Sequence, residues 1–397
     1  MRLDGDFLLW YDEQNKGCVF MKLTNAVLEY IKAHEQEALE LLMELAVIPA
    51  PSHHEERRAA FCKQWLERQG AQGVYIDEAL NVVWPIGCTE DNDLAVFMAH
   101  SDVVFPDTDT LPMRVENGRI HCPGVCDDTA NVVAMLMAAK YIAQQNMLPS
   151  NCGVLLVVNS GEEGLGNLKG CRRIMQDYGS RIREFVTFDD KNGQGVDRAV
   201  GSMRYRVAVE TEGGHSFSNF GRPNAIAQLA ALIADLYKVE VPDYGRTTYN
   251  VGTVEGGTSV NTIAQQAEML YEFRSDDQRG LAYMQQRFDE IIAAHKSAGV
   301  SLAVTKVGDR PCGGDINAAV QQEMKQRADD AAMQYLGRHM HFKTGSTDCN
   351  IPLSMGIASI CVGCCDGDGC HTREEYLDVK GIYPGLCMAF AMILHHF

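Results

Sequence analysis

The spacing of apolar residues along the first half of the chain predicts helices that alternate with short strands. Residues 24–47 place apolar side chains at helical intervals, which indicates one or two amphipathic helices. Ser52 and Glu55 form a capping-box pattern, and we expect the helix that follows to end at Gly70. Further strands are expected at 74–76, 81–86, 94–99, 153–158 and 184–188, and further helices at 130–145 and 167–178. Such β/α alternation favours a mostly parallel sheet covered by helices.

The pattern changes after residue 201. The expected elements are strand 204–210, helix 223–238 with Pro223 in its first turn, strands 248–254 and 266–274, a helix from Asp276 capped by Ser275, and strand 301–306. That β-α-β-β-α-β order is typical of a small ferredoxin-like domain. The chain then returns to helix, strand and helix at 316–335, 357–363 and 380–395, which we assign to the first sheet. We therefore expect a discontinuous catalytic domain, 1–201 with 309–397, and an inserted lid or dimerisation domain, 202–308.

Composition and charge narrow the classes of partner. The 397 residues are enough for two domains, and 46% of them are hydrophobic. A formal net charge of −18 argues against binding to nucleic-acid phosphates or to an anionic membrane surface. No apolar stretch is long enough to span a bilayer, and the amino terminus lacks the features of a signal peptide. The 14 scattered cysteines indicate reduced thiols and a cytoplasmic location.

Imidazole and carboxylate groups follow the predicted strands at the points where those strands end. Because parallel strands present their carboxyl ends at one edge of a sheet, we expect these groups to lie close together. They are His100 and Asp102 after strand 94–99, Glu162 and Glu163 after strand 153–158, Asp189 and Asp190 after strand 184–188, His371 after strand 357–363, and Asp127 and Asp128 in the turn before helix 130–145. A cluster of this kind without thiolates suits one or two Zn²⁺-like ions.

Simpler interpretations exist for several of these features. A single carboxylate such as Asp102 or Asp189 could be an ordinary surface group. His53 and His54 are typical of a solvated helix start, and the cysteines at 361–370 are best interpreted as free thiols. Two short glycine-rich stretches, at 164–170 and 366–369, lack the rest of a dinucleotide or a calcium pattern.

Taken together, the motifs resemble a known family. FMAHSDVV, GVCDDTANVVAM, VVNSGEEGLGNL, VTFDD and GCHTREEYL, with GGHSFSNFGRPNAI and NVGTVEGGTSVNTIAQQAEMLYEFR in the small domain, are similar to the co-catalytic metallopeptidase family twenty. This family includes carboxypeptidase G-type enzymes, tripeptidase T, aminoacylase and succinyl-diaminopimelate desuccinylase. The resemblance runs from about residue 38 to the end, in the family's order, and is greatest for the tripeptidase-T-like branch. It implies a zinc-exopeptidase type of sheet.

The resemblance also implies a role for each matching residue. His100 and Asp189 would bind one ion, Glu163 and His371 the second, and Asp127 would bridge both; Asp102 would orient His100 and Glu162 would be the general base. In the small domain, His215 would stabilise the oxyanion, and Asn261 and Arg274 would bind a substrate carboxylate. The equivalent of His215 often reaches into a neighbouring subunit's site, which implies a homodimer. The ions would be Zn²⁺, with Co²⁺ or Mn²⁺ as alternatives.

The expected function follows from these roles. We expect a dinuclear metal-dependent hydrolase of amide bonds in small peptides, of the tripeptidase or aminopeptidase kind, in which Glu162 activates a metal-bridged water. An N-acyl amino acid deacylase or a carboxypeptidase on the same scaffold is the alternative. A non-catalytic peptide-binding protein is disfavoured, because all five ligands and the base are present. The family usually has lysine where this chain has Thr129, a difference that concerns the bridging turn rather than the ligands.

Overall fold

The chain folds into two compact units. The computed structural model describes residues 3–4, 7–11 and 19–397, so part of the amino-terminal stretch that bears on the absence of a signal peptide lies outside the described residues. One unit comprises the chain up to Arg198 together with Gly314–Phe397, and the other comprises Ala199–Gly313. The second unit is slightly longer at both ends than the insertion expected from the sequence. No helix among the described residues is long and apolar enough to cross a membrane.

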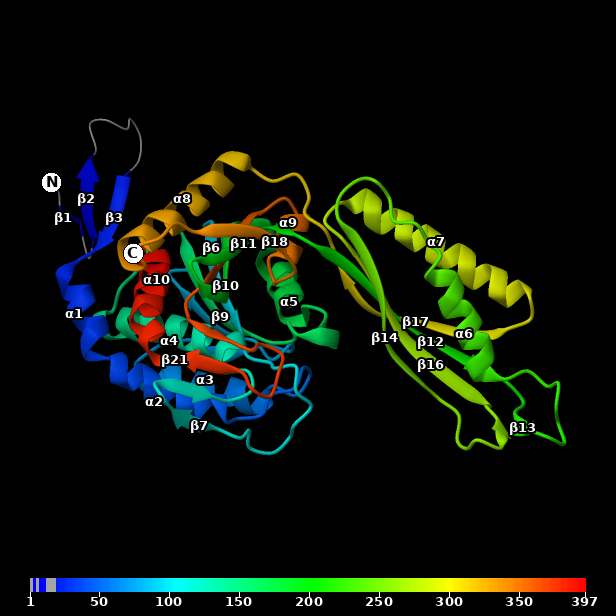
Figure 1. The fold of residues 1–397 in the computed structure, drawn as a ribbon. Helices are drawn as coiled ribbons and strands as arrows, with labels where there is room; N and C mark the ends of the chain where they lie inside the picture. The colour runs from blue at the N-terminus through cyan, green and yellow to red at the C-terminus, as the bar shows by residue number, and fades with distance from the viewer. Residues whose placement is uncertain (1–2, 5–6, 12–18) are drawn as a thin grey trace. The chain divides into compact units, whose positions relative to one another are not determined.

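The first unit is built on an eight-stranded sheet (Figure 1). Its strand order is β18 (His341–Gly345), β11 (Gln194–Ala199), β19 (Ala358–Gly363), β10 (Ile182–Asn192), β6 (Leu94–His100), β9 (Gly153–Asn159), β5 (Val82–Ile86) and β4 (Tyr75–Ile76). The four strands β19, β10, β6 and β9 run parallel to one another, whereas β11, β5 and β4 pair antiparallel with their neighbours. The predicted mostly parallel sheet is therefore confirmed, with antiparallel strands at its edges.

Helices cover both faces of this sheet. On one face, α4 (Ala130–Gln145), α8 (Ala318–Tyr335) and α10 (Ile382–Leu394) pack together, with α1 (Asn25–Ala33), α2 (Glu35–Ala46) and α3 (Glu56–Arg68) around them. On the other face lie α5 (Lys169–Tyr178) and the short α9 (Asn350–Ser354), which contact each other. Every residue of β6 and of β9 is buried, since helices lie above and below them. This explains why both strands read as continuous apolar runs.

A smaller sheet brings two loops of the first unit together. It contains β20 (Gly367–Asp368), β21 (Tyr376–Asp378), β8 (Arg119–His121) and β7 (Arg114–Glu116), in that order. Strand β8 leads into the turn η1 (Val125–Thr129), and β21 begins after the loop that carries His371. The pairing of β21 with β8 therefore places the His371 loop beside the Asp127 turn. The amino-terminal strands β1 (Leu3–Asp4), β2 (Phe7–Tyr11) and β3 (Val19–Leu23) form a separate antiparallel sheet.

The second unit has the predicted ferredoxin-like order. Strands β14 (Thr247–Gly256), β16 (Gln266–Ser275), β12 (Gly201–Glu210) and β17 (Ser301–Arg310) form an antiparallel sheet. Helices α6 (Ala225–Leu236) and α7 (Gln278–Ser297) cover one of its faces (Figure 1) and bury an apolar core between themselves and the strands. A short ribbon of β13 (Gly214–His215) and β15 (Thr262–Ile263) extends from one end of the unit.

Three predicted helix starts are wrong. Helix α6 begins at Ala225 with Asn224 as its cap, so Pro223 lies before the helix rather than in its first turn. Helix α3 begins at Glu56 with Glu55 at the cap position, and the Ser52 hydroxyl donates instead to Asp102, so the capping box does not form. Helix α7 is capped by Asp277, which accepts a hydrogen bond from the Arg279 amide, rather than by Ser275. For α3 and for α7, the acidic residue immediately before the helix occupies the cap position, and the predicted serine lies further upstream.

Candidate metal centre

Three neighbouring strands of the first unit deliver functional groups to one edge of the sheet. His100 is the last residue of β6, Glu162 and Glu163 follow β9, and Asp189 lies near the carboxyl end of β10. Since β9 and β10 flank β6 and all three run parallel, these groups converge at their carboxyl ends.

Asp127 and His371 complete the cluster from two loops. His100 Nε2 lies 3.1 Å from Asp127 Oδ1, and His371 Nε2 lies 3.1 Å from Asp127 Oδ2 and 3.1 Å from Glu163 Oε1. Three overlapping groups place their donor atoms within 4.8 Å of one another: His100, Asp127 and Asp189; Asp127, Glu163 and His371; and His100, Glu162 and Glu163. All five residues expected as metal ligands, with Glu162, are therefore brought together.

The electrostatics of the cluster are those of crowded carboxylates around two imidazoles. Burial raises the pKa of Asp189 well above its usual value, and the charge of Asp127 adds to that effect. Burial also raises the pKa of Glu163 to about 7, although the hydrogen bond from His371 opposes the rise. For His100, burial disfavours the charged form, but the carboxylates of Asp128, Asp102 and Asp127 outweigh it and raise the pKa well above the usual value. The imidazoles and the other groups of the protein therefore stabilise the negative charge of these carboxylates only in part.

These donors fit divalent cations. Imidazole nitrogens and carboxylate oxygens in groups of three suit Zn²⁺, Co²⁺ or Mn²⁺. Among the described residues, none donates a hydrogen bond to the Asp189 carboxylate, although that group lies in the middle of the acidic cluster. Asp189 is half-buried, and a carboxylate partly withdrawn from water without a donor is costly unless a cation neutralises it. The donor set and this carboxylate both match the metal that the sequence pattern implies.

Asp102 holds the backbone of the two glutamates that follow β9. Its carboxylate is fully buried and accepts hydrogen bonds from the backbone amides of Glu162 and Glu163, each at 3.0 Å, and from the Ser52 hydroxyl at 2.6 Å. His100 Nδ1 lies 3.5 Å from Asp102 Oδ1 and 3.1 Å from the Asp102 backbone oxygen. Burial would raise the pKa of Asp102, but His100 and these donors lower it to about 2. One ionised carboxylate thus fixes both glutamates.

Several buried polar residues hold the ligands in place; Asp128, expected from the sequence in the cluster itself, is one of them, and Arg58, which the sequence did not single out, is another. Asp128 accepts the His100 amide at 2.9 Å and the Asn131 side-chain amide at 2.6 Å, so it faces away from the cluster. Arg58 is fully buried and donates to the Ser101 backbone oxygen at 3.0 Å and to Thr129 Oγ1 at 3.1 Å. Burial lowers the pKa of Arg58 to about 10, and nearby Asp102 and Glu375 oppose that change. An arginine within an ordinary amphipathic helix pattern gives no signal that it is buried.

The three expected residues of the small domain all lie in the second unit and fall into two places. His215 in β13 and Asn261 beside β15 are joined through the hydrogen bond from the Ser216 amide to the Asn261 backbone oxygen. Arg274 lies near the other end of β16 and forms its ion pair with Glu272 rather than with Asp276 or Asp277. Arg274 is eight residues along β16 from Gln266, a span of about 27 Å for an extended strand, so the two places lie towards opposite ends of β16.

The hydrogen bonds to His215 indicate the tautomer of its neutral ring. The backbone amides of Phe217 and Ser218 donate to Nδ1, at 3.2 and 3.4 Å. A nitrogen that accepts hydrogen bonds carries no proton, so in the neutral ring Nε2 carries it and can donate. The side chain is exposed.

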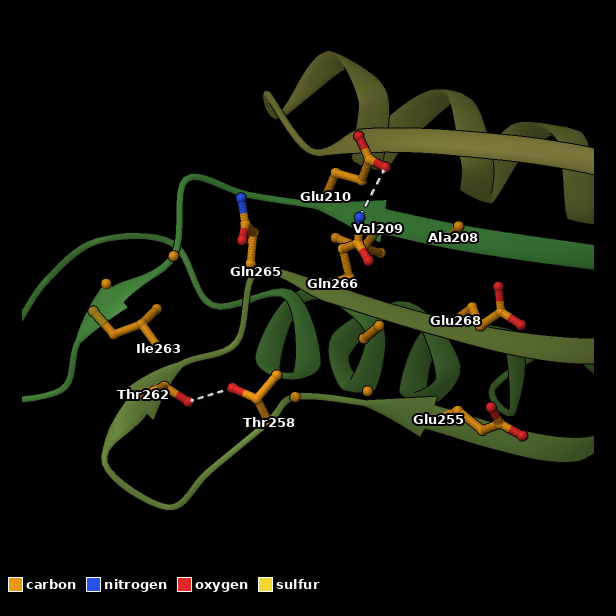
Figure 2. Close-up of a pocket in the computed structure, with 15 residues that line it drawn as sticks. Ala208, Val209, Glu210, Glu255, Thr258, Thr262, Ile263, Gln265, Gln266 and Glu268 are labelled. Atoms are coloured by element: carbon orange, nitrogen blue, oxygen red, sulfur yellow. Dashed lines mark hydrogen bonds between the residues drawn. The ribbon is translucent and has the colours of Figure 1, made fainter.

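A cavity of about 710 Å³ lies next to the His215 ribbon (Figure 2). Gly213, Gly214, Thr262 and Ile263 form the wall on the ribbon side. The sheet side carries three carboxylates from three strands: Glu210, Glu255 and Glu268. Figure 2 shows Glu255 and Glu268 on adjacent strands, where they are direct cross-strand neighbours. The ribbon therefore borders a hollow whose floor is acidic.

The fold and the convergent cluster together are those of a metal-dependent hydrolase of amide bonds. Residues 96–395 match Peptidase family M20/M25/M40, and the chain belongs to this family. The matched range contains all five expected ligands and Glu162. The protein is a hydrolase that acts on peptide or amide bonds, and its family implies a divalent metal.

Individual relatives agree with this assignment. The chain is similar to the uncharacterized protein YqjE of Bacillus subtilis, with 25% identity over 91% of this chain and 98% of the relative. It is also similar to the putative succinyl-diaminopimelate desuccinylase DapE of Mycobacterium tuberculosis, with 25% identity over 87% and 95% of the two chains. Among solved structures, a tripeptidase of Staphylococcus aureus shares the fold with a TM-score of 0.70 and 21% identity, over 90% of this chain and 97% of that one.

Proposed function

We propose that the protein is a dinuclear metal-dependent exopeptidase that hydrolyses amide bonds in small peptides. The observation that carries this proposal is the position of Asp127. Its two carboxylate oxygens face different histidines, Oδ1 towards His100 and Oδ2 towards His371, and it belongs to two of the candidate ligand groups. A carboxylate in that position can bridge two ions.

The remaining ligands divide between these two groups. His100 and Asp189 would hold one ion with Asp127, and Glu163 and His371 would hold the other. When bound, the two ions supply Lewis acidity, which lowers the pKa of a bound water and polarises the carbonyl of the substrate. The donor set accepts Zn²⁺, which we propose as the natural ion, and also Co²⁺ or Mn²⁺.

Glu162 is the proposed general base. Its side chain is buried, and its carboxylate lies within 4.8 Å of donor atoms of His100 and Glu163. The hydrogen bond from its backbone amide to Asp102 fixes its position without engaging its carboxylate. Glu162 would take a proton from the attacking water and return it to the leaving amine.

The second unit would supply substrate contacts. His215 Nε2 carries the proton needed to stabilise an oxyanion, and the guanidinium of Arg274 can bind a carboxylate through two parallel hydrogen bonds. Since His215 and Arg274 lie towards opposite ends of β16 within one unit, we propose that they serve different active sites of a homodimer. Phe217, Phe220 and Val260, which lie beside His215 and Asn261, are exposed large apolar side chains, as expected of a surface that a second copy covers.

A deacylase of N-acyl amino acids is the second candidate. The relatives at 25% and 28% identity include a putative desuccinylase and an acetylornithine deacetylase, both named for removal of an acyl group. The same metal cluster would serve either substrate class, and only the substrate pocket would differ. The exposed carboxylates near the ribbon favour a substrate with a free amino group over one whose amine is acylated.

A substrate screen with metal analysis tests both candidates. Di-, tri- and N-acyl amino acid substrates are offered to one preparation whose metal content is measured in parallel. We expect hydrolysis of di- or tripeptides that scales with the content of two ions per chain. Hydrolysis of N-acyl amino acids alone would support the deacylase instead, and full activity in a metal-free sample would refute the metal mechanism.

We also propose a cytoplasmic location. All thirteen described cysteines are free thiols, and most of them are buried. Thiols in this number persist in a reducing compartment.

A further inference from the structure

Glu375 is a buried carboxylate next to the proposed metal centre, and nothing described so far gives it a role. Only 1% of its surface is exposed. It follows His371 by four residues and immediately precedes β21, and its own backbone oxygen accepts the Cys122 amide at 3.2 Å. The β21–β8 pairing therefore fixes where its side chain starts.

The Glu375 carboxylate collects three backbone amides from the turn that carries Asp127. Gly124 N donates to Oε2 at 2.7 Å, and the amides of Cys126 and Asp127 donate to Oε1, each at 2.9 Å. The last of these donors belongs to the proposed bridging ligand itself. Hydrogen bonds from amides to an ionised carboxylate are about twice as strong as neutral ones. Glu375 thus binds the whole amino-terminal half of the turn.

The other end of the same turn is held by a cation. Thr129 Oγ1 donates to the Gly124 backbone oxygen at 2.5 Å and accepts from the buried guanidinium of Arg58 at 3.1 Å. The turn is therefore fixed on its amide side by Glu375 and on its carbonyl side through Thr129. Within it, Asp127 adopts φ −111° and ψ 90°, outside the helical region, so no regular helix holds it there.

We propose that Glu375 is a positioning residue, whose carboxylate holds the Asp127 turn in the conformation that binds both metal ions and links that turn to the His371 loop. The inference rests on the proposed bridging role of Asp127. Because Asp127 belongs to both ligand groups, release of its turn should weaken both ions rather than one.

Glutamine is the informative replacement. It has the size of glutamate, but one of its two oxygens becomes an NH₂ group that cannot accept. In either orientation of the glutamine side chain, its NH₂ group faces a backbone N–H group in a buried site. The facing group is that of Gly124 in one orientation and those of Cys126 and Asp127 in the other. Aspartate is the second variant, since it keeps the charge and shortens the reach by one methylene. Glu374→Gln is the matched control, because the adjacent Glu374 is exposed and pairs with Arg114 at the surface.

The experiment measures the dissociation constants of both Zn²⁺ ions by chelator competition, together with the melting temperature of each metal-free protein. We expect Glu375→Gln to raise both dissociation constants about 10- to 100-fold, as is common when a carboxylate behind a metal ligand is replaced. Glu374→Gln should match the wild type and Glu375→Asp should lie between. The absorption bands of the Co²⁺-loaded protein should also change in Glu375→Gln, since the geometry of Asp127 changes.

Two outcomes would overturn the inference. One is a pair of dissociation constants within twofold of wild type in Glu375→Gln. The other is a lowered melting temperature of the metal-free protein with unchanged metal affinity, which would indicate a merely structural residue. If Glu375→Gln does not fold, the same comparison is decided by Glu375→Asp. Asp127→Ala distinguishes a failure of the proposed function from a failure of this inference. If Asp127→Ala keeps both ions, the proposed function fails. If Asp127→Ala loses both ions and Glu375→Gln keeps them, only the proposed role of Glu375 fails.

Discussion

The functional residues of the two units differ in how firmly the protein holds them. In the first unit, His100, Asp102 and Glu162 are buried, and buried hydrogen bonds fix each at the backbone or the side chain. In the second unit, His215 and Asn261 are exposed, and their hydrogen bonds come from their own short ribbon. Of the six clustered residues of the first unit, only His371 is exposed, so most of that site is held in place before any substrate arrives. The second carries groups whose surroundings would be completed by another molecule.

The largest effect should come from the centre of the first unit. Asp127→Ala removes the carboxylate shared by two ligand groups, so we expect loss of both ions and of all measurable hydrolysis. Metal content per chain, measured after dialysis against a metal-buffered solution, checks this. Retention of one ion would show that the two groups are independent and that Asp127 does not bridge.

Glu162→Gln should separate chemistry from metal binding. The Asp102 hydrogen bonds to the backbone amides at 162 and 163 do not involve the changed side chain, so both ions should stay. Turnover should fall by about 10²- to 10⁴-fold, the usual contribution of a general base. Steady-state kinetics on the best peptide substrate, with metal content as the control, measures this; activity within a few-fold of wild type would remove Glu162 as the base.

His215→Ala tests whether the second unit acts on a neighbouring subunit. We expect a fall in kcat of about 10²- to 10³-fold, as for the loss of one oxyanion donor, with metal content unchanged. Mixing inactive Glu162→Gln chains with His215→Ala chains should then restore activity. If His215 acts across subunits, a mixed dimer has one intact site; if it acts within its own chain, every site carries a lesion and no activity returns.

Arg274→Met should have the smallest effect of the four. Loss of a charge-assisted contact costs about 1.5–3 kcal/mol, which corresponds to a rise in KM of about 10- to 100-fold for substrates with a free carboxylate. Amidated substrates should be unaffected. Arg279→Met is the control, because Arg279 is exposed in the same unit, where it pairs with Asp277 and lies over the ring of Tyr244. An equal change in KM for amidated peptides and for peptides with a free carboxylate would exclude a contact between Arg274 and the substrate carboxylate.

The elements that could be predicted from the sequence are those with strong local patterns. The continuous apolar runs of β6 and β9 and the change of rhythm near residue 202 were sufficient for the parallel sheet and the ferredoxin-like unit. The edge strand β18 and its neighbour β11 were not predicted, since both are partly polar. The starts of α3 and α7 were wrong because the side chain that takes the cap position depends on tertiary contacts of Ser52 and Ser275.

The residues of the candidate site likewise divide into those that could be predicted from the sequence and those that could not. Residues that follow strands could be found from chain order and the resemblance, and the structure brings all five expected ligands together. Arg58 and Glu375 could not be found, because each has a neighbour of the same charge type and only burial distinguishes it. Sequence alone gives no indication of which of Glu374 and Glu375 faces the interior.

The hydrogen bonds that Asp102 accepts from two consecutive backbone amides have a practical consequence for protein engineering. Geometry at positions 162 and 163 is specified through the main chain, whereas reactivity is specified by the side chains. The two properties are therefore separable: the acid at position 162 can be exchanged for groups of different length or basicity while the ligand beside it keeps its orientation. A library confined to position 162 would vary proton-transfer chemistry on a constant scaffold.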